Sequence, residues 1–233
     1  MIITIANESG GATKSILAEN LATIRTLAGR KVLLLDNDPQ HPCVNWSYER
    51  QVKGQHPPVA ARTITGKGLQ PELENLSYRY HDIVIDTESR DCMGSRSALS
   101  AAHVVIIAID LDRLDHLHAS KLAARIAVAQ LFNSRVRILV VMIGNEPAQM
   151  SEQMAERMSA INSFVSSIPS ARLFPTTIHS GSALRQAYQG GLSICEAQPS
   201  DPLAISEMEG LCDEVFRSHP SSRQHNDYQH QAR

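Results

Sequence analysis

Short, continuous runs of apolar residues alternate along the chain with longer segments in which apolar residues recur at helical spacing. The continuous runs are Ile2–Ala6 and residues 32–35, 83–85, 104–109 and 138–143. Each run is too short for an isolated helix, and several are rich in β-branched residues, so we expect five strands. Helical spacing predicts helices over residues 15–28, where Gly29 follows as a terminator, and over 119–131.

Continuous apolar runs, unlike alternating ones, are typical of strands that are covered on both faces. We therefore predict an α/β fold with a doubly wound, mostly parallel sheet and helices on both faces. With 233 residues and 42% hydrophobic content, the chain fits one large domain better than two. We expect this domain to span residues 1–216 and a disordered polar tail to occupy 217–233. Residues 51–70, rich in glycine and proline, are expected to form a long surface excursion.

The composition limits the classes of partner. A formal net charge of −2 gives no global nucleic-acid signature, so any DNA contact has to come from a local patch. The chain has no run of roughly 18 apolar residues and no basic leader before MIITIA, so we expect a cytoplasmic protein without membrane contact. The four cysteines are scattered and form no CxxC pair, which disfavours zinc and a disulfide framework.

The strongest local signal is ESGGATKS, residues 8–15, between the first predicted strand and the first predicted helix. Glycines after a strand let backbone N–H groups turn toward phosphate oxygens, and the N-terminal end of the helix adds its dipole. Lys14 is placed to reach terminal phosphates and the Ser15 hydroxyl to ligate Mg²⁺. Thr13 stands where the strict P-loop pattern has glycine, so the alternative is a simple strand–turn–helix junction.

Acidic residues follow two neighbouring strands. Asp36 and Asp38 end the second apolar run, and Asp86 ends the strand predicted over residues 81–86. Each alone has an alternative role as a helix cap or turn residue. Together with Lys14 and Ser15 they predict a site for a nucleotide and Mg²⁺, because phosphoryl transfer needs carboxylates that hold the ion and orient water.

The segments SGGATKS, LLLDNDPQ and HDIVIDTES, in this order, resemble the ParA/MinD family of deviant Walker-box ATPases. Residues 36–40 match that family's D-x-D-P-Q element in full, and residues 178–194 resemble its final region. The resemblance is closest to small ParA-type plasmid partition ATPases without an N-terminal DNA-binding domain, and it covers residues 1–216. It implies a P-loop NTPase fold of the deviant Walker A type.

The resemblance also implies cofactors and roles. ATP and Mg²⁺ are the implied cofactors, with Lys14 on the β- and γ-phosphates and Asp38 as the residue that orients or activates the attacking water. The implied metal-site residues are Ser15, Asp36 and Asp86. The implied nucleotide-binding residues are Ser9, Gly10, Gly11, Ala12, Thr13, Lys14, Ser15, Ile16, Asn145 and Pro175. Asn145 and Pro175 occupy places where relatives contact the adenine, although Asn145 also suits an ordinary turn.

The implied partners follow from the same family. Its members form an ATP-dependent sandwich homodimer that binds DNA without sequence preference and associates with the nucleoid. A centromere-binding or cargo adaptor protein stimulates hydrolysis and releases the ATPase. Candidate phosphate contacts for such DNA binding are Arg172, Arg185 and Arg217. Arg185 has the alternative role of a structural ion-pair residue.

Two positions depart from the family pattern. The signature lysine, which reaches the partner subunit's phosphates, falls at Ser9, and the loss of such a cation costs about 10³-fold in rate by analogy with arginine fingers. Thr13 strains the loop wherever the backbone favours glycine. Three accounts are open: another cation, Lys121 or Arg90, replaces the lysine; hydrolysis is slow and nucleotide binding acts as a switch; or the site is degenerate.

Two other functions compete with partition. One is a metabolic P-loop transferase similar to dethiobiotin synthetase, which shares the sheet and loop but is disfavoured by D-x-D-P-Q. The other is an accessory nucleotide-binding protein in plasmid transfer or stability, with weak or no hydrolysis. A metal shared by His116 and His118 is also disfavoured, because positions i and i+2 lie on different faces of a helix.

Overall fold

The computed structural model describes residues 1–7, 12–64, 66–111, 116–144 and 152–217. The strands are β1 (Ile2–Ala6), β2 (Val32–Asn37), β3 (Ala60–Thr63), β4 (Asp82–Thr87), β5 (Val104–Asp110), β6 (Arg137–Gly144), β7 (Ala171–Leu173) and β8 (Ile178–His179). The α-helices are α1 (Thr13–Leu27), α2 (Pro42–Val52), α3 (Leu69–Ser77), α4 (Met93–Ala101), α5 (His116–Phe132), α6 (Glu152–Ser167), α7 (Ser182–Gln189) and α8 (Pro202–Phe216). Two short 3₁₀ helices span Gly66–Gly68 and Ile194–Glu196.

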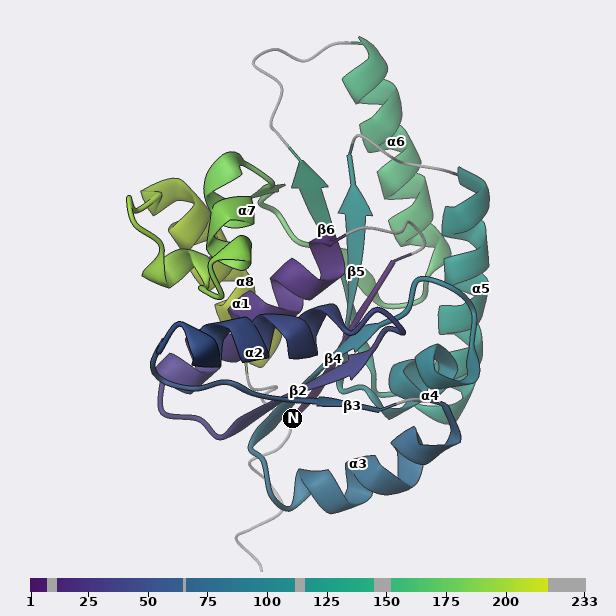
Figure 1. Ribbon diagram of the computed structural model, residues 1–233. Coiled ribbons are helices and arrows are strands. Elements are labelled where there is room, and N and C mark those ends of the chain that lie inside the picture. Colours follow the sequence, from purple (N-terminus) through teal and green to yellow (C-terminus); the bar gives the residue numbers. More distant parts are fainter. Residues whose placement is uncertain (8–11, 65, 112–115, 145–151, 218–233) are drawn as a thin grey trace, which may run out of the picture.

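The eight strands form one sheet in the order β3-β2-β4-β1-β5-β6-β7, and β8 extends the pairing of β6. All described pairings are parallel. Helices α1, α2, α7 and α8 cover one face, and α3 to α6 cover the other (Figure 1). This three-layer arrangement confirms the predicted doubly wound parallel sheet.

The central strands have buried side chains along their whole length because helices cover both faces. Every residue of β1, β2 and β4 is buried. On one face the core centres on α1, where Leu17 and Leu21 are fully buried. On the other face, α4, α5 and α6 contribute Leu99, Ile126 and Ile161. Burial of one such side chain stabilises the fold by about 1.5–3 kcal/mol, so this double-sided core accounts for the continuous apolar runs.

The five predicted strands are confirmed as β1, β2, β4, β5 and β6, and the two predicted helices as α1 and α5. The surface excursion predicted over residues 51–70 is wrong in part. This segment holds the end of α2 and the edge strand β3, and it buries Val59, Ile64 and Leu69. Strand β3 was missed because its sequence, AART, has no apolar run and its side chains are mostly exposed.

Other expectations meet the structure only partly. Of the predicted tail, residues 217–233, only Arg217 lies within the described residues. In the described part of the chain we find no helix with both the length and the apolar character that a membrane crossing requires. The cysteines are free thiols, and Cys43 and Cys212 are buried. His116 and His118 belong to the first turn of α5, as a polar helix start would place them.

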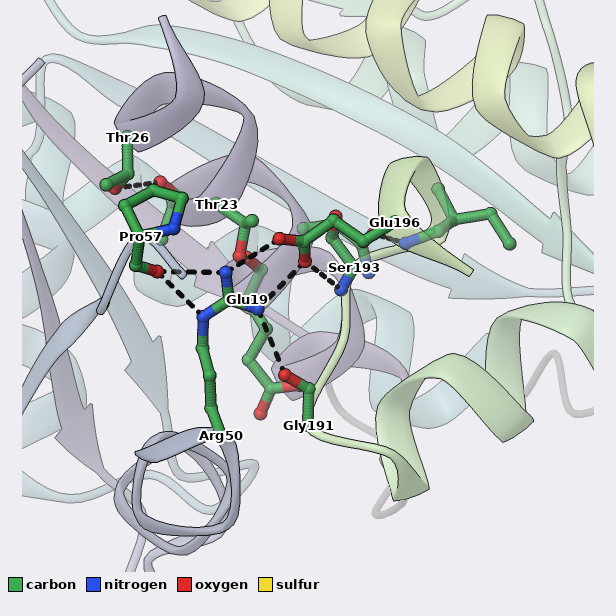
Figure 2. Close-up of polar contacts among 11 residues, drawn as sticks. Glu19, Thr23, Thr26, Arg50, Pro57, Gly191, Ser193 and Glu196 are labelled. Atoms are coloured by element: carbon green, nitrogen blue, oxygen red, sulfur yellow. Dashed lines mark hydrogen bonds and ion pairs between the residues drawn. The ribbon is translucent and has the colours of Figure 1, made fainter. Parts of the chain in front are cut away.

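A buried arginine links α2 to the segment after α7 (Figure 2). The Arg50 side chain is only 1% exposed, and it donates two hydrogen bonds to the Glu196 carboxylate at 2.8 and 2.7 Å. Its other donors reach the carbonyl oxygens of Pro57 and Gly191. Gly191 has φ of +71°, and a Cβ there would lie 2.8 Å from the Arg50 backbone nitrogen, so only glycine fits.

We predict that Arg50→Met lowers the free energy of unfolding by about 3–5 kcal/mol, because Glu196 is left as a buried charge without its partner. Urea unfolding followed by circular dichroism measures this change. Arg62→Met is the matched control, since its ion pair with Glu72 is exposed and should change stability by less than about 1 kcal/mol. Equal effects of the two substitutions would contradict the assigned role of Arg50.

Candidate nucleotide and magnesium site

The ammonium group of Lys14 is held at the end of β1, in the first turn of α1. The Lys14 side chain is buried, and its Nζ donates hydrogen bonds to Asn7 Oδ1 at 2.7 Å and to Ser89 Oγ at 2.6 Å. Burial lowers the pKa of Lys14, and the negative charge of Asp86 opposes that shift. The two neutral oxygens therefore orient the ammonium without neutralising it, so its charge remains available to an anion.

The hydroxyl of Ser15 lies against the carboxylate that ends β4. Ser15 Oγ donates a hydrogen bond of 2.5 Å to Asp86 Oδ2, and the Cys43 thiol approaches the same oxygen at 3.3 Å. Burial raises the pKa of Asp86 to about 6, although the hydrogen bond from Ser15 and the charge of Lys14 both act to lower it. Among the described residues, Asp86 Oδ1 is buried and has no hydrogen-bond partner.

This geometry fits a divalent cation. A buried carboxylate oxygen without a donor is costly unless a charge compensates it, and carboxylate and hydroxyl oxygens are ligands that Mg²⁺ accepts. Within the described ranges, no group of three or more His, Cys, Asp or Glu side chains is arranged to hold a metal by itself. A Mg²⁺ ion at Ser15 and Asp86 would therefore take its other ligands from water and phosphate, as Mg²⁺ usually does.

The two aspartates of the β2–α2 loop differ in their surroundings. Asp36 is fully buried; its Oδ1 accepts from the backbone N–H of Asp38 at 3.1 Å and its Oδ2 from that of Val44 at 3.0 Å. Burial raises the pKa of Asp36, and these backbone donors oppose the shift. Asp38 is half-buried, accepts from the Gln40 N–H at 2.9 Å and lines a cavity. Asp36 thus fixes the loop that presents Asp38.

A further acid lies beneath the site. Glu19 of α1 is buried, and burial together with the negative charge of Asp86 raises its pKa well above the usual range. At neutral pH Glu19 is therefore protonated, and it adds no negative charge beside Asp86.

These side chains surround a cavity of about 950 Å³, which is large enough for a nucleotide. It is walled by the start of α1, the β2–α2 loop, the β4–α4 loop, α5 and α7. Residues that line it are Ala12, Ser15, Asp38, Pro39, Gln40, Pro42, Glu88, Ser89, Arg90, Asp91, Lys121, Ala124, Arg125 and Tyr188.

The structure brings most, but not all, of the predicted residues together. Ala12, Thr13, Lys14 and Ser15 lie at the start of α1, next to Asp36, Asp38 and Asp86. Ile16 points into the core, and its backbone N–H already bonds to Ala12 O. Pro175 is exposed between β7 and β8 and does not line the cavity. Ser9, Gly10, Gly11 and Asn145 lie outside the described residues.

Several residues of the site escaped the sequence analysis. Asn7 and Ser89 bind Lys14, and Arg125 and Tyr188 line the cavity. Asn7 carried a weak signal, because it is a polar residue directly after a buried strand. The other three sit on a loop or on helices, where only tertiary packing determines which side chains face the cavity.

Comparison with known proteins places this geometry in a family. Residues 3–184 match the family model described as the CobQ/CobB/MinD/ParA nucleotide binding domain. The chain belongs to this family. A comparison with curated proteins found no match.

Solved structures with low sequence identity share the fold of this CobQ/CobB/MinD/ParA domain. Apo McdA from Cyanothece is 18% identical, with 92% of this chain and 98% of that chain covered and a TM-score of 0.73. A plasmid partition protein from Borrelia burgdorferi, bound to AMPPNP, is 20% identical over 93% and 98% of the two chains, with a TM-score of 0.66. Cobyrinic acid a,c-diamide synthase from Mycobacterium smegmatis, with an ATP analogue and magnesium, is 18% identical over 95% and 96%, with a TM-score of 0.67.

We predict opposite effects of Asp86→Asn on stability and on metal binding. The folded-state pKa of Asp86, about 6, is above the ordinary value of 3.8, so its contribution to stability is complete below pH 4 and is lost as the pH rises through 6. Above pH 6 the metal-free variant should be more stable than the wild type by about 2 kcal/mol, while Mg²⁺-dependent nucleotide binding is lost. Chemical unfolding at pH 4 and pH 8 without Mg²⁺ measures the first effect. A variant less stable than the wild type at pH 8 would contradict this electrostatic account.

Proposed function

We propose that this protein is a Mg²⁺-dependent ATPase of the DNA-partition type. In this proposal its ATP-bound form is a homodimer that binds DNA without sequence preference and positions a plasmid or other cargo through an adaptor protein. It works in the cytoplasm, on the nucleoid when ATP is bound. The observation that carries the proposal is the convergence of Lys14, Ser15, Asp86 and the DNDPQ loop on one cavity at the sheet edge.

The chain's own residues have separate roles in this reaction. Lys14, held by Asn7 and Ser89, exchanges those neutral partners for the β- and γ-phosphates. Ser15 and Asp86 hold Mg²⁺, which when bound neutralises charge that develops on the phosphates. Asp36 acts through the backbone of the β2–α2 loop and water, because both of its oxygens already accept backbone N–H groups. Asp38, at the cavity wall, orients the attacking water.

Support for DNA binding is local rather than global. Arg172 and Arg185 are exposed on β7 and α7, and Arg217 forms an exposed pair with Glu214 at 3.1 Å. Contacts of such arginines to phosphates are sensitive to salt and carry no base information, as non-specific binding requires. The names of McdA and of the Borrelia partition protein also favour a positioning role over a metabolic one.

A second candidate is an accessory nucleotide-binding protein with weak or no hydrolysis, in plasmid transfer, plasmid stability or protein-cargo positioning. One observation favours it: Ser9 stands where the family's signature lysine falls and supplies no charge to the transition state. A metabolic transferase is a weaker rival. The synthase from Mycobacterium smegmatis shares the fold, but the complete D-x-D-P-Q element is typical of the partition branch.

ATP hydrolysis, with and without non-specific DNA, tests the proposal together with light scattering for dimerisation. We expect slow turnover that falls at least about 100-fold in Asp38→Ala, because that variant loses the group that orients water. Its ATP-dependent dimerisation should persist. Asp213→Ala, an exposed substitution on α8, is the matched control and should behave as the wild type.

The outcomes separate the candidates. Dimerisation of the wild type with ATP but without turnover would favour the accessory binding protein. Turnover that survives in Asp38→Ala would contradict the assigned role of Asp38. A wild-type protein that neither binds ATP nor dimerises would contradict both candidates.

A further inference from the structure

Two basic residues of α5, Lys121 and Arg125, line the same cavity as Ser15 and Asp38. They are four residues apart, so one helical face carries both side chains. Lys121 is exposed, whereas the Arg125 side chain is only 10% exposed. The α5 wall of the cavity is therefore cationic over at least one helical turn.

The burial of Arg125 calls for a ligand of opposite charge. Desolvation lowers the pKa of its guanidinium, which shows that the charged form is held at a cost. The acid closest to it among the printed pairs is Asp91, with 3.9 Å between Arg125 Nη1 and Asp91 Oδ1. Arg96 donates two hydrogen bonds to the same carboxylate, at 2.8 and 2.7 Å, so Asp91 is mainly committed to Arg96.

Arg90, the other basic residue of the cavity wall, is a poorer candidate for binding an anion there. Its side chain is 82% exposed, and its Nε donates a hydrogen bond to Glu88. The charge of Arg90 is thus partly neutralised within its own loop and faces solvent. Of the two cations that the sequence suggested as substitutes for a lysine at Ser9, the structure favours Lys121 over Arg90.

On the basis of the proposed ATPase function, we propose that Lys121 and Arg125 form an anion-binding wall that contacts the terminal phosphate of ATP from within the same chain. A triphosphate brings more negative charge into the cavity than Lys14 alone offsets. Cations fixed in advance around a phosphoryl group stabilise the charge that develops during its transfer. Arg125, anchored by packing, gives the wall a fixed donor, and Lys121 gives it a mobile one.

Competitive nucleotide titration in Mg²⁺ tests this wall, because a terminal-phosphate contact discriminates ATP from ADP. We expect Lys121→Gln and Arg125→Gln each to weaken ATP binding about 10-fold or more, the usual effect of losing a charged hydrogen bond. ADP affinity should change less than about 2-fold, since ADP lacks that phosphate. Arg125→Lys should recover part of the loss. Arg135→Gln, an exposed charge just beyond α5, is the matched control and should leave both affinities unchanged.

Thermal unfolding checks that each variant is folded, and Lys121→Glu carries the test if Arg125→Gln is not, because position 121 is exposed. Folded Lys121 variants with the ATP-to-ADP preference of the wild type would overturn the inference. If the wild type binds ATP and Lys14→Ala loses it while the Lys121 variants bind normally, only this inference fails. If the wild type binds no ATP, the proposed function fails with it.

Discussion

Parallel pairing of β2, β4 and β1 is the constraint on which the site depends, because it brings the carboxyl ends of three strands to one edge. In this register Asp36 lies beside Asp86, and Asp86 lies beside Ile5, two residues before Asn7. Helix α1 begins at that same edge, so its first turn delivers Lys14 and Ser15 to the side chains that end the strands. A shift of one residue in any of these strands would turn the carboxylates to the opposite face of the sheet.

The same convergence concentrates buried charge, and the surrounding fold has to tolerate it. Burial raises the pKa values of Asp36, Asp86 and Glu19 and lowers that of Lys14, so these groups resist ionisation in the metal-free protein. A bound cation and anion would relieve this cost. Stability is supplied at a distance instead, where Arg50 ties α2 to the segment around Glu196. Helix α2 follows the Asp38 loop directly, so that ion pair also supports the loop's position.

The central fold was predictable from sequence, since buried parallel strands give continuous apolar runs that β1, β2, β4, β5 and β6 all show. Strands β3, β7 and β8 were not, because they are short and their side chains are largely exposed. Lys14, Ser15 and Asp86 were predictable because their roles depend on position relative to a strand end. Arg125 was not, since only packing against α4 and the cavity decides which face of α5 its charge occupies.

Calorimetric titration of the wild type and of Lys14→Ala with ATP, in the presence and absence of Mg²⁺, tests the central claim most directly. The account predicts saturable, Mg²⁺-dependent binding that falls at least about 10-fold in Lys14→Ala, because the buried ammonium that meets the phosphates is gone. It also predicts wild-type binding in Lys31→Ala, which removes an exposed lysine at the start of β2. Unchanged ATP affinity in Lys14→Ala would contradict the assignment of this cavity as the nucleotide site.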